Sequence, residues 1–343
     1  MATLAEVARK AGVSTSVASK VLNKSATPIS VSPATRARIQ DAAADLDYVP
    51  DARARALRQQ QSSVLGILTG SLNGVLRPQF VHHLSGGLIA RRKEFLLGVH
   101  RHDPEVVRDY VRTFRSHRTF AVLILGEEDF LTDSTRELLQ EGVGECGPWI
   151  VVAFTPRVNP VPAVTIDLPW VMKELGRMLL ADRRDKVFLI SRAADHSNAV
   201  FAETLRKSIE MPTEVLIERT DEPLSHAENA IAMLLERCRG QRAAVVTETD
   251  NEAALVAKGL LQAGVSVPKE IAVVGYGGLQ VSWCSTPSIS AFDVMGAVPD
   301  MARKTMELLD EVIAGRELAP EDHTFRPRFV VRDSFRPPES ATS

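Results

Sequence analysis

From residue 64 onward, short apolar runs alternate with longer stretches in which apolar positions recur at helical spacing. The short runs predict β-strands and the longer stretches predict amphipathic helices. Such alternation is typical of parallel sheets covered by helices. The predicted strands are 64–68, 95–99, 121–125, 149–154, 164–166, 187–190, 214–217, 243–246 and 271–275, and the predicted helices are 105–114, 131–140, 171–180, 202–209, 227–237 and 252–261.

These strands are too many for one sheet of ordinary size, so we expect an α/β body with two lobes. The chain is expected to pass from the first lobe to the second near Pro160–Ala163. Ligands of open α/β folds bind beyond the carboxyl ends of the strands. A ligand site is therefore expected where the two lobes face each other.

The first 46 residues follow a different pattern, with three short amphipathic stretches separated by turn residues. Thr3 and Glu6 form a capping box that starts the first helix, and Gly12 ends that helix in a left-handed turn. Ser32 and Pro33 supply the N-cap and the first residue of the third helix. The third helix is expected to turn its apolar side inward, at Ile39, Ala42, Ala43 and Leu46. The pattern predicts a three-helix head with a helix-turn-helix.

The second helix of the head carries the residues that indicate a function. Ser14 is its predicted N-cap and Asn23 its end. Its inward side chains are predicted to be Val17, Val21 and Leu22, and its outward side chains Thr15, Ser16, Ser19 and Lys20. Short hydroxyl side chains and one Lys at the start of a helix can enter a DNA major groove and reach base edges. A solvated amphipathic helix would carry similar residues, so this surface alone leaves both interpretations open.

Charge along the chain favours a polyanion as the partner of the head. The first 60 residues contain nine Lys and Arg against five Asp and Glu, although the chain of 343 residues has a net charge of −2. The rest of the chain is therefore acidic. A basic head on an acidic body is consistent with nucleic-acid binding, although a solvated basic face would give the same count.

Composition bounds the class of protein. An apolar content of 45% and a charged content of 24% are those of a folded, water-soluble chain with two or three domains. The amino-terminal region has no apolar run long enough for a signal peptide or membrane anchor, so a cytoplasmic protein is expected. Three cysteines far apart in sequence suggest neither a disulfide framework nor a zinc site, and buried free thiols are expected at Cys146, Cys238 and Cys284.

Motifs of enzymes are missing from the sequence. It contains no phosphate-binding loop, metal-binding histidine pair on a helix turn or nucleophile elbow, so we expect no enzyme, no cofactor and no metal. The glycines of 275–278 are interpreted as a tight turn. The acidic residues 127–129 are interpreted as a solvated loop, and His82, His83, His100 and His102 as surface or loop residues.

Several motifs resemble those of the LacI/GalR family of transcription factors. In the head they are Ala11-Gly12-Val13-Ser14, Val21-Leu22-Asn23, Tyr48-Val49-Pro50 and residues 54–57. In the body they are Val273-Val274-Gly275-Tyr276 and residues 327–334. The resemblance extends over nearly the whole chain. It implies a helix-turn-helix domain at 1–49, a hinge at 50–61, a two-lobed body similar to periplasmic binding proteins at 62–334 and a tail at 335–343.

The resemblance also implies which residues bind DNA. In the family, residues matching Thr15, Ser16 and Lys20 read bases, and the residue matching Leu57 on a hinge helix wedges into the minor groove. Core packing is the alternative for Leu57, although three nearby arginines leave it few apolar partners. The full set of expected DNA-binding residues is Thr3, Ser14, Thr15, Ser16, Ser19, Lys20, Asn23, Ser32, Tyr48, Arg53, Ala54, Leu57 and Arg58.

The body departs from the family's sugar-binding pattern at two positions. Ser197 stands where the family usually has an Arg, and Gly277 stands where it usually has an Asp. Without that guanidinium and that carboxylate a simple neutral hexose is not expected, and an acidic lining favours a cation or a hydrogen-bond-donating ring. The expected effector residues are Arg77, Gln79, Asp167, Ser197, Asn198, Asp250 and Gly277, with Phe80 and Trp283 as stacking surfaces.

The sequence therefore predicts a repressor that binds a palindromic operator as a homodimer, in the cytoplasm and associated with the nucleoid. A small molecule between the lobes would control it. Two alternatives stay open, a metabolite-binding protein and a regulator controlled by a protein partner instead of a small molecule. The large two-lobed body opposes a third, a purely architectural DNA-binding protein.

Overall fold

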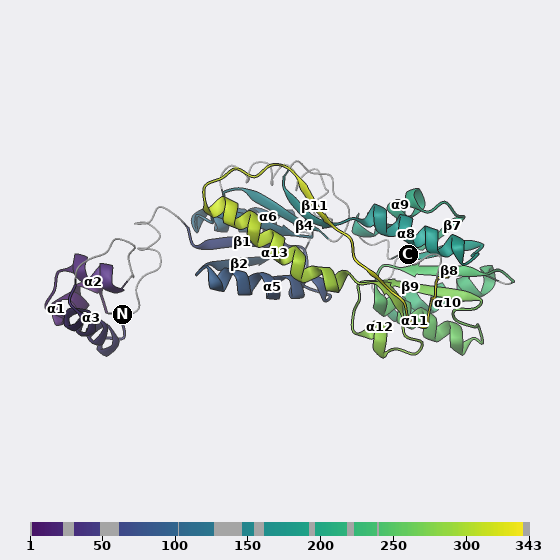
Figure 1. Cartoon of the computed structure of the whole chain (residues 1–343), viewed down its shortest axis with the longest axis horizontal. Coiled ribbons are helices and arrows are strands. Elements are labelled where there is room, and N and C mark those ends of the chain that lie inside the picture. Colours follow the sequence, from purple (N-terminus) through teal and green to yellow (C-terminus); the bar gives the residue numbers. More distant parts are fainter. Residues whose placement is uncertain are drawn as a thin grey trace. The chain divides into compact units, whose positions relative to one another are not determined.

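The computed structural model describes residues 2–22, 31–48, 62–101, 103–126, 146–153, 161–191, 196–217, 223–238 and 240–338. The chain forms two compact units, Met1–Ser63 and Val64–Ser343, which we call the head and the body. Figure 1 labels the elements of both units.

The described residues of the head form three helices, α1 (Leu4–Lys10), α2 (Thr15–Leu22) and α3 (Pro33–Asp45). Thr3 and Glu6 form the predicted capping box, in which each side chain accepts a hydrogen bond from the backbone N–H of the other residue. Gly12 has a φ of 65°, the left-handed turn that was predicted. Ser32 caps α3, and Pro33 is its first residue. The three predicted helices are confirmed. They enclose a small apolar core of Val7, Ala8, Ala11, Ala18, Val21, Ile39, Ala42 and Ala43.

The body contains two six-stranded sheets, one in each lobe. The first sheet has the order β11-β5-β4-β3-β1-β2, and the second has the order β12-β10-β9-β8-β6-β7. Neighbouring strands run parallel, except that β12 runs antiparallel to β10. The first sheet consists of β1 (Val64–Thr69), β2 (Glu94–Val99), β3 (Ala121–Leu125), β4 (Trp149–Ala153), β5 (Ala163–Ile166) and β11 (Asp322–Phe325). The second consists of β6 (Lys186–Ser191), β7 (Thr213–Ile217), β8 (Ala243–Thr247), β9 (Ile271–Tyr276), β10 (Ser290–Phe292) and β12 (Phe329–Val330).

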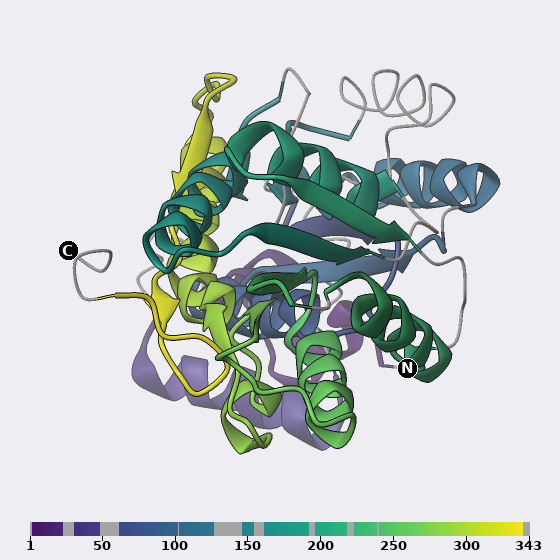
Figure 2. The same cartoon turned by 90° about the vertical axis from the view of Figure 1, so that its right-hand side faces the viewer.

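Helices surround the strands of the body (Figure 2). Every strand that the sequence predicted is present, and so is each predicted helix outside 131–140, a range that lies beyond the described residues. Among the described residues, the helices of the first lobe are α5 (Leu76–Ala90), α6 (Pro104–Ser116) and α13 (Val294–Ile313). Those of the second lobe are α8 (Leu168–Ala181), α9 (His196–Ser208), α10 (Pro223–Arg237), α11 (Asp250–Gln262) and α12 (Val281–Cys284).

The sequence pattern did not predict α5 and α13, which pack against each other in the first lobe. Both helices contain residues of low helix propensity, among them Gly86 and Gly87 in α5 and Pro299 in α13. Close packing explains one of these residues, because a Cβ at Gly87 would lie 2.8 Å from Cγ of Met306. Tertiary contacts therefore stabilise helices that the local sequence does not favour.

Three chain segments connect the lobes. The first crossing lies at Asp167, between β5 and α8, and the second lies at Asp293, between β10 and α13. The third crossing, residues 326–328, joins β11 to β12. The expectation that the first crossing lies near Pro160–Ala163 is wrong, because Ala163 begins β5, which still pairs with β4 in the first sheet.

Two further expectations about the body are corrected by burial. Cys146 and Cys238 are buried free thiols as expected, but Cys284 is exposed at the end of α12. Phe335 is fully buried and packs against Phe329, so the body continues beyond the boundary expected at residue 334.

Candidate functional site

The outward face of α2 presents polar side chains next to a buried apolar face. Thr15, Ser16 and Lys20 are exposed, whereas Ala18 and Val21 are buried in the head. Ser14 lies just before α2, and its Oγ accepts a hydrogen bond from the backbone N–H of Val17 at 3.3 Å. The two hydroxyls and the ammonium are therefore held on a helix of fixed orientation within the head.

Ser19 does not lie on this outward face. Only 4% of the residue is exposed, so the expectation that it faces outward is wrong. It follows the buried Ala18 in α2. A contact from Ser19 to a base is therefore not supported by its position.

The other head residues expected to contact DNA have mixed placements. Thr3 and Ser32 are exposed N-caps, and Tyr48 packs partly buried against the apolar core. The expected contacts at Asn23, Arg53, Ala54, Leu57 and Arg58 lie outside the described residues.

In the body, Asp250 is fully buried at the start of α11. Its Oδ2 accepts a hydrogen bond from the backbone N–H of Leu279, while its Oδ1 is buried without a partner among the described residues. Burial raises the pKa of this carboxyl from 3.8 to about 6, although the hydrogen bonds from Leu279 and Gly278 oppose the rise. The expectation of an Asp250 that lines an open ligand site is therefore not met in this structure.

Glycines make room for this carboxylate. An added Cβ at Gly275 would lie 2.3 Å from Oδ1 of Asp250. Gly277 and Gly278 have φ values of 145° and 74°, which other residues rarely adopt. The tight turn expected at 275–278 begins later than predicted, because Gly275 and Tyr276 still belong to β9 and the chain bends only from Gly277. An Asp at position 277 would be strained in this backbone conformation.

Asp167 lies at the first crossing and is already engaged. Its Oδ1 accepts a hydrogen bond from the backbone N–H of Trp170 at 3.1 Å, and its Oδ2 pairs with Nε of Arg326 at 3.0 Å. The Arg326 guanidinium also lies 5.3 Å from the centre of the Trp170 ring. Both oxygens of Asp167 are thus used within the chain.

A second carboxylate of the same kind, at Asp293, was not predicted as a functional residue. It caps α13 through the backbone N–H of Gly296 at 2.8 Å and pairs with Nε of Arg328 at 3.4 Å. A sequence signal for it exists, because an Asp between an apolar run and a helical stretch is a common N-cap.

The remaining effector residues are not brought together as a stacking site. Phe80 is fully buried in the core of the first lobe, and Trp283 is 69% exposed on α12. The side chain of Phe80 is therefore not available for stacking on a ligand. Arg77 lies half-buried against Gly126 at the end of β3, and Gln79 is exposed on α5. Ser197 and Asn198 lie within α9, where their side chains are outside the described set.

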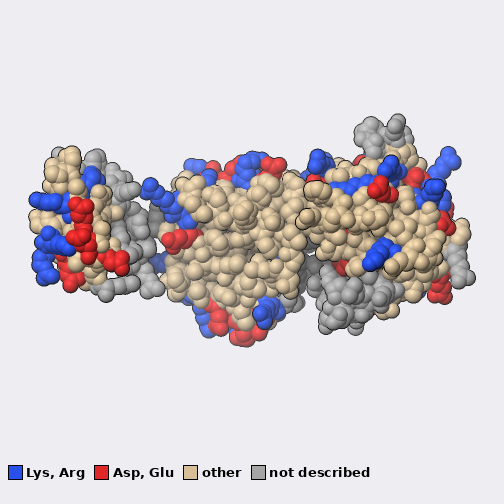
Figure 3. Space-filling view, turned by 90° about the horizontal axis from the view of Figure 1, so that it is seen from below, with Lys and Arg blue, Asp and Glu red and all other residues tan. Residues whose placement is uncertain are grey.

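The outer face of α5 carries no charged side chain. Its exposed residues are Pro78, Gln79, His82, His83, Gly86, Ile89 and Ala90. By contrast, α6 carries Glu105, Arg108, Asp109, Arg112 and Arg115. Figure 3, viewed from the side of α5 in Figure 1, shows a broad uncharged area on the body with charges toward its margins. Ile89 is 73% exposed on this face.

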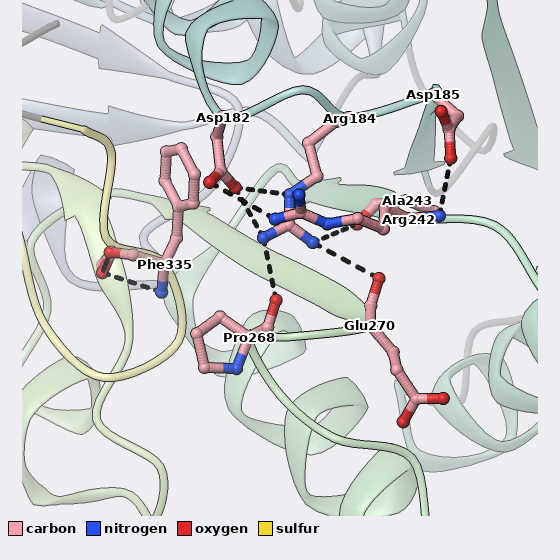
Figure 4. Close-up of polar contacts among 9 residues, drawn as sticks. Asp182, Arg184, Asp185, Arg242, Ala243, Pro268, Glu270 and Phe335 are labelled. Carbon is pink, nitrogen blue, oxygen red and sulfur yellow. Dashed lines mark hydrogen bonds and ion pairs between the residues drawn. The ribbon is translucent and has the colours of Figure 1, made fainter.

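Arg184 is the centre of a buried polar cluster in the second lobe (Figure 4). Its residue is 6% exposed. The guanidinium pairs with Asp182 at 2.6 Å and donates to the backbone carbonyls of Ala243, Pro268 and Glu270. Because β6, β8 and β9 begin next to these residues, the cluster lies at the amino ends of the strands, the edge opposite the expected ligand site.

Metal and membrane sites are not found where the structure can be described. Across these residues, no three His, Cys, Asp or Glu side chains are grouped to hold a metal ion. In the same part of the chain, no helix has both the length and the apolar character needed to cross a bilayer. The expectation that His100 is a surface or loop residue is corrected, because it is only 1% exposed just after β2.

Two parts of the chain match known protein families. Residues 3–51 match the bacterial regulatory proteins of the lacI family, and residues 179–335 match the periplasmic binding protein-like domain.

Curated relatives cover almost the whole length. The HTH-type transcriptional regulator GntR of Pseudomonas aeruginosa is 26% identical, over 92% of this chain and 90% of that protein. The HTH-type transcriptional regulator GalS of Salmonella typhimurium is 27% identical, over 97% of this chain and 96% of that protein.

Solved structures show the same fold. A lac repressor dimer bound to operator and the anti-inducer ONPF superposes with a TM-score of 0.81 at 19% identity, covering 97% of this chain and 98% of that one. A complex of the transcriptional regulator CelR with cellobiose superposes with a TM-score of 0.65 at 22% identity, covering 98% of this chain and 100% of that one.

Proposed function

The chain belongs to the LacI/GalR family of transcriptional regulators, and on that premise we propose that it represses transcription by binding a palindromic operator as a homodimer. The observation that carries this proposal is the outward face of α2. Thr15, Ser16 and Lys20 are exposed there, on the second helix of a helix-turn-helix. In this fold the second helix enters the major groove with its amino-terminal residues on base edges.

The uncharged outer face of α5 supports the homodimer. A second copy of the chain would cover Ile89 and its uncharged neighbours, and the lac repressor with a similar fold is described as a dimer. Two heads related by a two-fold axis read two half-sites, so the operator takes the symmetry of the protein.

The hinge at 50–61 is part of this proposal on sequence grounds. Leu57 is proposed to insert into the minor groove, where an apolar wedge opens a base step and bends the duplex. Arg53 and Arg58 would contact the phosphates on either side.

Selection from a random duplex library with the full-length chain tests the proposed function. We expect enrichment of one sequence with two inverted half-sites. Failure to enrich any sequence, at a salt concentration low enough for electrostatic binding, would contradict sequence-specific recognition. Enrichment of a single half-site without its inverted copy would contradict the homodimer.

Replacing Lys20 with alanine tests the role of α2 on the selected operator. The ammonium can donate to guanine acceptors, and a good base contact is worth about 1 to 3 kcal/mol of discrimination. We therefore expect Lys20→Ala to weaken operator binding by about 5- to 150-fold while binding to random DNA changes little. Fluorescence anisotropy titrations on both duplexes measure this.

Lys10 provides the matched control, because it is also an exposed lysine of the head but pairs with Asp45 at 2.8 Å away from α2. Lys10→Ala is expected to affect both duplexes alike. If Lys20→Ala also weakened both duplexes equally, Lys20 would contact phosphate and not a base.

We propose that a small molecule between the lobes controls operator binding, through its different affinity for the lobe orientations. A neutral hexose is not the proposed ligand. Both acidic candidates are already engaged within the chain, Asp167 with Arg326 and Asp250 with the backbone of Leu279. Isothermal titration with glucose and galactose is expected to give no binding. Micromolar affinity for either sugar would contradict this part of the proposal.

The family to which the chain belongs consists of transcriptional regulators, and we propose that this chain has no catalytic activity. We further propose that it acts in the cytoplasm at the nucleoid, where its operator would be found.

A further inference from the structure

Two junctions between the lobes have the same local geometry. Asp167 has φ and ψ values of −74° and 72°, and Asp293 has values of −83° and 73°. Each residue follows a strand and caps the helix that comes next, since its Oδ1 accepts a hydrogen bond from the backbone three residues later. The two junctions therefore share the same backbone conformation and the same way of capping a helix.

Each junction joins an element of one lobe to an element of the other. Asp167 connects β5 of the first sheet to α8, which packs against α9 in the second lobe. Asp293 connects β10 of the second sheet to α13, which packs against α5 in the first lobe. The conformation of each aspartate therefore fixes the angle between a strand of one lobe and a helix of the other.

The third crossing provides a cation for each aspartate. Nε of Arg326 lies 3.0 Å from Oδ2 of Asp167, and Nε of Arg328 lies 3.4 Å from Oδ2 of Asp293. Only Pro327, which is buried, separates the two arginines. We call these two contacts the hinge pairs.

Backbone hydrogen bonds place each hinge pair at the edge of a different lobe. The N–H of Asp167 donates to the carbonyl of Phe325 at 2.9 Å, just beyond the first sheet. The N–H of Asp293 donates to the carbonyl of Arg328 at 2.9 Å, just beyond the second sheet. Hydrogen bonds therefore join the third crossing to the first crossing at one end and to the second crossing at the other. Pro327 lies between these two contacts.

We infer that Asp167 and Asp293 are paired positioning residues, which together with Arg326 and Arg328 hold the lobes in the orientation seen in this structure. This inference rests on the proposed function in one respect, that the lobe orientation carries the ligand signal to the operator. Each aspartate uses one oxygen to hold the helix and the other to hold the third crossing. A change of lobe orientation must therefore alter both hinge pairs together.

The exposure of the arginines suits a contact that forms and breaks. The side chains of Arg326 and Arg328 are 60% and 81% exposed, so water screens both ion pairs. Two weak ion pairs are sufficient to favour one lobe orientation. A ligand shifts the equilibrium between two orientations by the difference in its affinity for them. A buried pair at either position would lock the hinge.

The two hinge pairs are not equal. The Asp167–Arg326 contact is shorter, and Arg326 also stacks on Trp170. We therefore expect Arg326→Gln to loosen the hinge more than Arg328→Gln does.

Distances between spin labels in the two lobes test this inference without DNA or effector, so failure here is distinct from failure of the proposed function. Labels are attached to the full-length chain at Arg112→Cys in α6 and Lys207→Cys in α9, whose native side chains are 72% and 73% exposed. The exposed Cys284 is replaced by serine, and excess unlabelled chain keeps labels to one per dimer.

Asp167→Asn removes the ion pair with Arg326 but keeps the helix cap, since asparagine caps a helix as well as aspartate does. We expect Asp167→Asn to broaden the distance distribution, Arg326→Gln to broaden it at least as much because it also removes the contact with Trp170, and the double variant to be no broader than Arg326→Gln. Arg326→Lys should restore part of the original width. Salt at about 1 M should broaden the unsubstituted chain but not the double variant.

Arg336 provides the control, because it pairs with Asp333 on the same terminal segment but within one lobe. Arg336→Gln should leave the distribution unchanged. If Asp167→Ala broadened the distribution while Asp167→Asn and Arg326→Gln did not, the aspartate would be only a helix cap and the inference would be overturned. It would also be overturned if the effects of Asp167→Asn and Arg326→Gln added up in the double variant.

Discussion

Replacing Arg184 with leucine is expected to lower the free energy of unfolding of the body by about 3 to 5 kcal/mol. The guanidinium is buried, pairs with Asp182 and donates to three backbone carbonyls, one at the start of β8 and two in the loop before β9 (Figure 4). Burial lowers the pKa of Arg184, but Asp182 opposes this change and the group stays charged. Leucine fills part of the volume and leaves the carbonyls without donors.

Urea unfolding followed by circular dichroism measures this loss at a fixed protein concentration. Arg206→Leu is the control, because Arg206 is exposed on α9 of the same lobe. Arg184→Lys should recover only part of the loss, since an ammonium lacks the planar fork that reaches several acceptors. A change of less than about 1 kcal/mol in Arg184→Leu would show that water replaces the guanidinium at these carbonyls.

Asp250→Asn is expected to stabilise the body at pH 7.5 by about 2 kcal/mol and to have little effect at pH 4. The folded pKa of Asp250, about 6, lies above its usual value of 3.8 because the carboxyl is buried. Protonation therefore favours the folded state. This contribution is fully present below pH 3.8 and is lost as the pH rises through 6. Above that range the chain carries a buried charge, and asparagine removes it while keeping an oxygen for the N–H of Leu279.

Urea unfolding of both chains between pH 4 and pH 7.5 checks the sign. The difference in stability should grow as the pH rises through this window. Asp300→Asn serves as the control, because the Asp300 side chain is 61% exposed on α13. A difference between Asp250→Asn and the unsubstituted chain that does not change with pH would contradict burial as the cause.

The head could be predicted closely from the sequence because its helices are defined by local signals. Thr3 with Glu6, Gly12, and Ser32 with Pro33 each act within a few residues of the helix end that they define. The prediction for Ser19 was wrong because the spacing of apolar residues along a helix does not show whether a small side chain next to the apolar face is buried. The strands of the body were predicted because they are short apolar runs, which are fully buried in β3, β8 and β9.

The candidate site could not be predicted in the same way, because its residues depend on partners far away in sequence. Asp250 is buried by the turn at Gly277 and Leu279, and Asp167 meets Arg326 from another crossing. Neither partner leaves a periodic signal. The sequence indicated carboxylates at strand ends correctly, but it could not show that Asp167 is paired within the chain and that Asp250 is buried.

The order of the strands in the two sheets also affects how the body folds during translation. The first sheet contains β1 to β5 from the early part of the chain and β11 from its end, and α13 covers α5 only after the whole second sheet up to β10 has been synthesised. During translation, the apolar side of α5 that meets Met306 therefore stays uncovered on the ribosome until residues 294–313 emerge. The earlier lobe cannot be completed before the later one, so both reach their final form together in the last steps of synthesis.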